Sequence, residues 1–285
     1  TPLLTPNNDP FWKGHLKRYS IDSSGNIAAT ADWDAGSLLY SRTADSRTIY
    51  TYKSGNLTAF NSSNITMADL GVATETNRLA IINFIRGGEQ SGTNQGWKLG
   101  DIYHSSPLTI GTPSAYFYDR IDTATTKAFD TYRLAHARPS SSGKRLIVAG
   151  ANDGQFHVFK TGEESAGGGT ELWSFIPPNL LTKLVTIAHS THPTALGHQY
   201  FVDGSLYASD VWLGSGSGTT KASTDWHTML VFALGRGGLS HLWSSSSSCD
   251  SGISDNYSST YNYYCGYYAF DITETTSTPI FKWHL

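Results

Sequence analysis

The stretch that decides the fold runs from Arg145 to Pro177 and reads RLIVAGANDGQFHVFKTGEESAGGGTELWSFIP. An apolar run over 146–150 is followed by the turn-forming Asp153-Gly154, and polar and apolar residues then alternate over 155–159. Alternation with a period of two indicates a strand, and Asp-Gly between two such runs favours a two-residue hairpin turn. After a glycine-rich loop, residues 171–175 begin another strand. The stretch therefore predicts an antiparallel meander of three strands.

The same plan occurs elsewhere in the chain, and recurrence of a small unit is the signature of a repeat architecture. Residues 47–60 contain an apolar strand, a serine-glycine turn and a strand that ends in Ala-Phe. Residues 229–238 open a third copy, whose second strand arrives at 267–271 after an insertion, and Trp283 then matches Trp173. Three irregularly spaced copies predict the blades of a β-propeller. A β-sandwich with coincidental Gly and Phe pairs is the alternative.

Motifs throughout the chain resemble one family. They are AxDGxxHxF at 151–159, ELWxFIPxxLL at 171–181, WKLGDIYHSSP at 97–107, HQYFVDG at 198–204, WHTMLV at 226–231 and an opening strand at 12–19. Together they resemble the C-terminal domain of the PilY/PilC family of type IV pilus tip-associated adhesins. The likeness covers nearly the whole chain, and the combination of LGDIxHSSP with GANDG is far more specific than either motif alone.

This resemblance implies a fold and a function. Residues 1–285 would form an all-β, propeller-like domain of quinoprotein-like repeats, modified or incomplete, and the N-terminal part of the family's C-terminal domain. The residues expected to be structural in the repeats are Asp101, Asp153, Gly154, Trp173 and Trp283. The implied function is non-enzymatic: an extracellular pilus biogenesis and adhesion factor at the filament tip, which contacts minor pilins and a surface or host cell.

Composition agrees with an exported β-rich protein. The 285 residues include 28 glycines, 13% aromatic residues and only 15% charged residues, against the usual quarter. A net charge of −3 gives no electrostatic footprint for nucleic acid. No apolar run approaches the roughly 20 residues that span a bilayer, and no signal peptide is present. We therefore expect a mature or excised part of an exported protein.

Short helices are expected as insertions between the strands. Residues 75–86 place apolar side chains at spacings that fit a helix about as well as a strand, but Gly87-Gly88 is a typical helix stop. Aromatic and alanine residues recur at helical spacing over 125–137, and leucines do so over 178–184. The sequence therefore predicts three inserted helices.

An unusual loop is expected at residues 244–266. Its two cysteines, Cys249 and Cys265, are the only ones in the chain, and in an exported protein they most simply form a disulfide that closes the loop. Four tyrosines in this stretch are candidate surface contacts, because Tyr offers a large amphipathic area at low entropic cost. They are Tyr257, Tyr261, Tyr263 and Tyr264. The alternative is an insertion that buries its own tyrosines.

Candidate metal ligands are sparse. Asp32 and Asp34 are spaced as in a calcium loop, but the later acidic positions and closing Glu are missing, so solvated loop carboxylates are the alternative. His189, His192 and His198 have no cysteine nearby and read as polar loop residues. The resemblance implies calcium binding in a full-length family member through an Asp-rich loop that these residues lack. We expect no cofactor in this chain.

Two other functions remain as alternatives. The first is a quinoprotein-like enzyme, but the chain lacks an adjacent cysteine pair, and the GSGSG at 214–218 lies in a flexible Gly/Ser tract. The second is a secreted binding module unrelated to pili, which would suit the four Asn-x-Ser/Thr sequons. These begin at Asn56, Asn61, Asn64 and Asn256.

Overall fold

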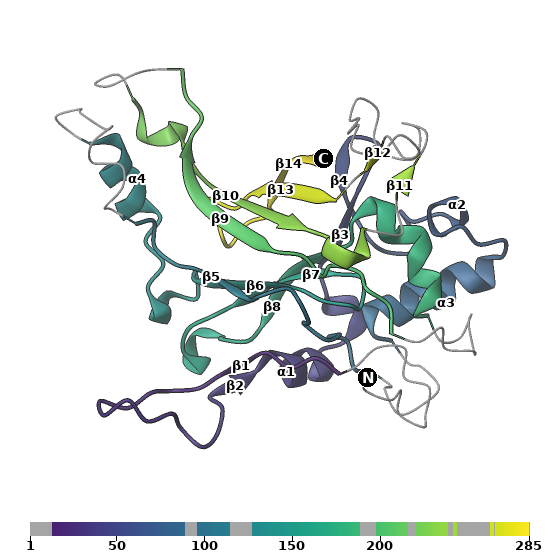
Figure 1. Ribbon diagram of the computed structural model, residues 1–285, viewed down its shortest axis with the longest axis horizontal. Helices are drawn as coiled ribbons and strands as arrows, with labels where there is room; N and C mark the ends of the chain where they lie inside the picture. Colours follow the sequence, from purple (N-terminus) through teal and green to yellow (C-terminus); the bar gives the residue numbers. More distant parts are fainter. Residues whose placement is uncertain are drawn as a thin grey trace.

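The computed structural model describes residues 13–88, 96–114, 127–188, 198–215, 221–238, 242–243, 263–264 and 266–284. Two β-sheets dominate this part of the chain. Figure 1 shows one sheet above the other, with the purple N-terminal segment on the far side of the lower sheet and helices at both ends.

The first sheet contains the predicted meander. Its strands β5 (Leu108–Ile110), β6 (Leu146–Gly150), β7 (Phe156–Lys160) and β8 (Glu171–Phe175) lie next to one another in sequence order, each antiparallel to its neighbour. The predicted two-residue turn is wrong. Gly150 pairs with Phe156, and the N–H of Ala151 donates to the carbonyl of Gln155, so the connection is longer.

The 47–60 copy is a hairpin, as predicted, but it does not form a separate sheet. Its strands β3 (Ile49–Lys53) and β4 (Asn56–Ala59) meet at a tight turn in which Ser54 and Gly55 both have positive φ, as type I′ turns require. Strand β3 then pairs in parallel with β8 through Ile49–Ser174 and Tyr50–Phe175. The hairpin thus widens the first sheet, in the order β4-β3-β8-β7-β6-β5.

The second sheet is another antiparallel meander. Its order is β14-β13-β10-β9, built from β9 (Leu206–Trp212), β10 (Trp226–Ala233), β13 (Tyr267–Asp271) and β14 (Ile280–His284). The expected third copy is therefore present, with β9 added in front of it.

A β-bulge fixes the correspondence between the two sheets. In the first sheet Trp173 pairs with Val158 and Glu171 with Phe159, which leaves Leu172 as the extra residue. In the second sheet Trp283 pairs with Ala269 and Phe281 with Phe270, which leaves Lys282. Trp173 and Trp283 therefore occupy equivalent positions in the two bulges.

The two sheets pack face to face around one core. The rings of Phe156 and Phe232 stack with centroids 4.3 Å apart, and Phe175 meets Phe270 edge-on at 4.9 Å. These side chains belong to one cluster of buried apolar residues drawn from both sheets. Offset and edge-on aromatic pairs add to the stabilisation from burial alone.

The opposite face of the first sheet is covered by the N-terminal segment. This segment contains β1 (Lys17–Arg18), β2 (Trp33–Asp34), α1 (Ala35–Ser41) and the short 3-10 helix η1 (Ala44–Ser46). Leu16, Trp33 and Leu39 pack there with Leu99, Ala151 and Phe159 in a second buried cluster.

The three predicted helices are present. Helix α3 (Glu75–Arg86) begins after Thr74, whose side chain accepts from the N–H of Asn77, and ends at Gly87 in the left-handed region. Helix α4 (Ala128–Ala135) is shorter than expected, and η4 (Pro178–Thr186) is a 3-10 helix. A further helix, α2 (Met67–Leu70), has a capping box between Thr66 and Asp69.

The remaining elements are short. They are the 3-10 turns η2 (Ser140–Ser142), η3 (Glu164–Ala166), η6 (Ser223–Asp225) and η7 (Gly235–Gly237), and the strand pair β11 (Leu242–Trp243) and β12 (Tyr263–Tyr264). Within the described ranges the sheets do not close into a ring, and none of the helices there is long and apolar enough to cross a membrane.

Candidate functional site

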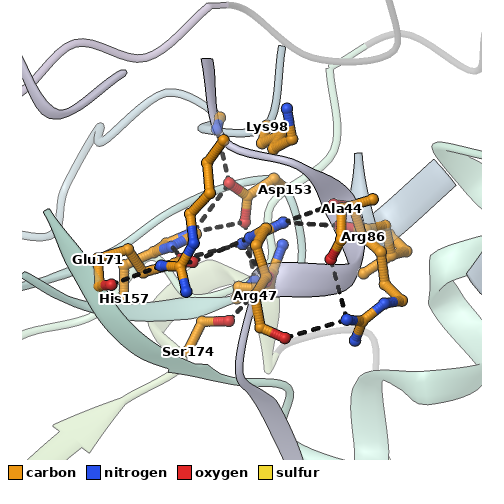
Figure 2. Close-up of polar contacts among 12 residues, drawn as sticks. Ala44, Arg47, Arg86, Lys98, Asp153, His157, Glu171 and Ser174 are labelled. Atoms are coloured by element: carbon orange, nitrogen blue, oxygen red, sulfur yellow. Dashed lines mark hydrogen bonds and ion pairs between the residues drawn. The ribbon is translucent and has the colours of Figure 1, made fainter. Parts of the chain in front are cut away.

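Three charged side chains lie at fully buried positions behind the first sheet. Arg47, His157 and Glu171 have no exposed side-chain surface. The Arg47 guanidinium donates to both Glu171 carboxylate oxygens, from Nε and from Nη2, at 2.9 Å each. His157 lies between two carboxylates, with Nδ1 2.8 Å from Glu171 and Nε2 3.0 Å from Asp153 (Figure 2). A two-pronged arginine–carboxylate pair is among the strongest polar contacts in proteins.

Neighbouring polar groups complete this buried charge network. Gln155 accepts from Arg47 and from the Ser174 hydroxyl through the same oxygen, at 3.0 and 2.8 Å. Asp153 accepts from the N–H groups of Gly100 and Gln155. Each buried charge thus has a partner of opposite sign and further hydrogen bonds, as buried ions require.

The network shifts the pKa values of its members. Burial opposes the charged imidazolium, but Asp153 and Glu171 outweigh burial and raise the pKa of His157 to about 9. Burial also favours the protonated form of Glu171, yet Arg47 and His157 hold its pKa well below the usual range. Burial and the nearby Arg47 lower the pKa of Lys98 to about 8. At neutral pH His157 is therefore a buried cation.

The network ties three parts of the chain together but has no access for a substrate. Arg47 comes from the start of the β3 hairpin and also donates to the carbonyl of Ile85 in α3. Arg86, beside it, donates to backbone carbonyls of Phe60, Ala44 and Arg47 (Figure 2). We conclude that these charges hold the hairpin and α3 against the first sheet.

The sequence predicted only part of this arrangement. Asp153 and Gly154 were expected to be structural turn residues; Gly154 has a φ of +96°, and a Cβ there would lie 2.5 Å from Leu184. Trp173 is 5% exposed in the core between the sheets. Arg47, His157 and Glu171 were missed as a group. The available signal was a charged residue, His157 or Glu171, within an otherwise largely apolar strand, whereas Arg47 lies just before β3.

A second polar cluster joins the segments that lead into β5 and β9. Asp101, another expected structural residue, accepts from Asn152 at 2.8 Å and from His198 at 2.9 Å. Asp203 accepts from the backbone N–H of His104 and contacts its Nδ1. These contacts hold together, at one end of the molecule, the two segments that lead into β5 and β9.

A pocket of about 490 Å³ opens at the same end, beside the second sheet. We call it the strand-end pocket. Its floor is largely apolar, and its rim carries a carboxylate, an imidazole and a guanidinium. The lining residues are His104, Asp203, Gly204, Ser205, Leu206, Tyr207, Val231, Phe232, Ala233, Gly235, Arg236 and Tyr267.

Aromatic side chains surround the rim. The Arg236 guanidinium lies 5.4 Å from the ring centre of Tyr200, and the rings of Tyr103 and His104 are 4.2 Å apart. Tyr207 and Tyr267 are 67% and 46% exposed. A mainly apolar concavity with a few polar groups at its rim is the usual form of a binding site.

The candidate calcium ligands do not converge. Asp34 caps α1 by accepting from the N–H of Gly36 and lies 2.6 Å from His15 Nδ1, whereas Asp32 accepts from the Ser20 hydroxyl and pairs with Arg18. In the part of the chain that the structure describes, no group of three or more His, Cys, Asp or Glu side chains could hold a metal ion. These two aspartates therefore do not fit a calcium site.

Several predicted residues lie outside the described residues. They are Cys249, Cys265, Tyr257, Tyr261, His189 and His192. Only the backbone of Tyr263 and Tyr264 is described, in β12, which pairs with β11. The disulfide and the tyrosine contact surface stay predictions. Trp283 is 45% exposed at the second sheet.

Comparison with known proteins gives a consistent result. Residues 99–257 match the family model described as the PilY1 beta-propeller domain. The chain is 30% identical over 234 residues to the type IV pilus biogenesis factor PilY1 homolog of Xylella fastidiosa, covering 80% of this chain and 17% of that protein. It is 30% identical over 249 residues to the type IV pilus biogenesis factor PilY1 of Pseudomonas aeruginosa strain UCBPP-PA14, covering 81% and 20%.

The chain thus spans about one fifth of the length of these relatives or less. No solved structure matches it. The family model covers more than half of the chain, and the sheet-dominated structure fits the β-propeller that the model describes. The chain belongs to the PilY1 β-propeller family.

Proposed function

We propose that this chain is part of a type IV pilus biogenesis factor that acts outside the cell at the filament tip, where it contacts minor pilins and a surface or host cell. The observation that carries the proposal is the similarity of four fifths of the chain to proteins named type IV pilus biogenesis factors. Neither a quinoprotein enzyme nor a binding module unrelated to pili is favoured by these comparisons.

The role proposed for the domain is structural and adhesive rather than catalytic. Two strongly shifted titratable groups, His157 and Glu171, are fully buried and paired with each other, so neither side chain is exposed to a ligand. Around the strand-end pocket, Tyr103, Tyr207 and Tyr267 are exposed, and exposed tyrosines are common in protein contact surfaces. This chain is proposed to work without a cofactor, and any calcium site would belong to other parts of the full-length protein.

The pilus role is tested by complementation in a piliated bacterium that carries the full-length protein. Deletion of its gene should strongly reduce surface filaments, and the wild-type gene should restore them. A Trp173→Ala copy should fail, because it removes a core side chain shared by the two sheets. Co-purification of minor pilins and tip labelling by immunogold complete the test. Normal piliation in the deletion strain, with no pilin bound, would contradict the proposal.

Adhesion is tested separately, through the predicted 244–266 loop. Replacing Tyr257, Tyr261, Tyr263 and Tyr264 together with Ala should lower attachment while leaving filament number unchanged. The matched control replaces two exposed tyrosines of the N-terminal segment, Tyr19 and Tyr40, with Ala. Equal attachment by both variants would show that the loop tyrosines do not contribute to adhesion. Thiol labelling before and after reduction checks the proposed Cys249–Cys265 disulfide.

A further inference from the structure

The floor of the strand-end pocket is made of residues whose equivalents in the first sheet are covered by other parts of the chain. The aligned bulges and strand registers make Tyr207, Val231 and Ala233 equivalent to Leu108, Val148 and Gly150, and Tyr267 equivalent to Phe156. Because residues paired across neighbouring strands share a face, these four positions form one patch in each sheet. All four of the second-sheet residues line the pocket.

In the first sheet, Phe232 of the second sheet stacks on Phe156, and the segment that leads out to the second sheet covers the patch at Gly150. A Cβ on Gly150 would lie 2.3 Å from the carbonyl oxygen of Val202 and 2.7 Å from its Cγ1, so Val202 lies directly against Gly150. The N–H of Val202 donates to the carbonyl of Ala151 at 3.3 Å. Phe201 and Val202 are both fully buried there. The patch thus accepts a peptide segment with a valine at its centre.

The rim of the strand-end pocket adds a charge preference. In the filled site, Val202 is followed by Asp203, whose carboxylate contacts His104. At the second site Arg236 borders the pocket, where its guanidinium lies 5.4 Å from the ring centre of Tyr200 and donates to the Tyr200 hydroxyl at 3.4 Å. No ion pair joins it to a carboxylate of the described residues. An arginine in this setting favours a carboxylate on whatever enters the pocket.

We propose that the strand-end pocket is a socket for a segment of the full-length polypeptide, the one that leads out of the second sheet as residues 200–205 lead out of the first. Its β-branched side chain covers Ala233 and Val231, and the acidic residue after it pairs with Arg236. The relatives are about five to six times as long as the stretch that they share with this chain, so their length can supply such a segment. The proposal does not depend on the pilus role.

A synthetic peptide tests the socket in the 285-residue chain. The probe is Tyr-Phe-Val-Asp-Gly-Ser, the sequence of residues 200–205, carrying a fluorescent label and followed by anisotropy. We expect saturable binding that weakens at least about tenfold with Ala233→Leu, because the added side chain occupies the valine site. The matched control is Ala59→Leu, the same change at an exposed position of β4, which should bind as the wild type does.

A second peptide tests the charge preference. Replacing Asp by Asn in the peptide should weaken binding about three- to tenfold to the wild type, but not to Arg236→Gln. Circular dichroism verifies that each variant is folded. Absence of saturable binding, or binding that Ala233→Leu leaves unchanged, would overturn the proposal. So would a dimer in sedimentation equilibrium that Ala233→Leu dissociates, because the occupant would then be a second copy.

Discussion

The two sheets share one strand arrangement, but their equivalent faces lie in opposite environments. The row Val148, Val158, Trp173 of the first sheet is buried beneath the second sheet. The equivalent row of the second sheet, Val231, Ala269 and Trp283, faces away from the first, and Trp283 is 45% exposed. The comparison shows that the repeat fixes the hydrogen-bonding register, whereas burial depends on what packs on each face.

Polar groups follow the same division. Behind the first sheet, Arg47, His157 and Glu171 are sealed from solvent. On the open face of the second sheet, Asp271 meets His227 and Lys282, whose side chains are 27% and 30% exposed. Removing one partner of a buried ion pair lowers the stability of the fold strongly, whereas removing one partner of a solvated pair lowers it little. The two groups of ion pairs should therefore respond very differently to mutation.

The largest contrast is expected at the equivalent tryptophans. Trp173→Ala should lower the free energy of unfolding by about 3–5 kcal/mol, because it leaves a cavity between the sheets. Trp283→Ala should lower it by less than about 1 kcal/mol, since water already reaches that side chain. Urea unfolding followed by circular dichroism measures both. Equal losses would show that Trp283 is as well packed as Trp173.

The ion pairs give the next contrast. Arg47→Ala should destabilise by about 3 kcal/mol, near the lower end for a broken buried pair, because His157 still faces Glu171. Lys282→Ala should change stability by less than about 1 kcal/mol, because its ammonium is partly solvated. The same unfolding experiment applies. A small effect of Arg47→Ala would mean that the β3 hairpin is held by apolar packing alone.

The pH dependence of the first sheet tests the charge on His157. Its folded pKa, about 9, lies above the ordinary value of 6.5, so its stabilisation is complete below pH 6.5 and is lost as the pH rises toward 9. We expect the wild type to lose about 2–3 kcal/mol across this window relative to His157→Gln. Comparing the two proteins cancels the opposite contribution of Lys98 and Lys183, whose pKa values are lowered to about 8. Parallel pH profiles would contradict a charged His157.

The smallest effect is expected where the two sheets differ by a single methyl group. Gly150→Ala should cost about 1–3 kcal/mol, because its Cβ would lie 2.3 Å from the Val202 backbone oxygen. The reverse change at the equivalent position, Ala233→Gly, should cost about 0.5–1 kcal/mol from backbone entropy alone. Thermal unfolding of both variants measures the difference. A neutral Gly150→Ala would mean that the 201–202 segment moves easily.

Local patterns in the sequence determined the strands and most of the helices. Alternation over 155–159, the Ser54-Gly55 turn and the glycine stop after Arg86 each report short-range backbone and burial preferences, and the structure contains the corresponding elements. The repeat predicted the match of Trp173 with Trp283, because a bulge and its register are set within one sheet.

Tertiary structure alone decided how these elements combine. The parallel pairing of β3 with β8 joins residues 125 positions apart, and no local pattern encodes such a partner. The same holds for the contact of Arg47 with Glu171, because a charged residue such as Glu171 in a strand is expected to face solvent until a second segment covers it. The sequence by itself determined the repeating unit and its register, because both depend on neighbouring residues. Which faces are covered, and where the pocket remains, depended on long-range packing.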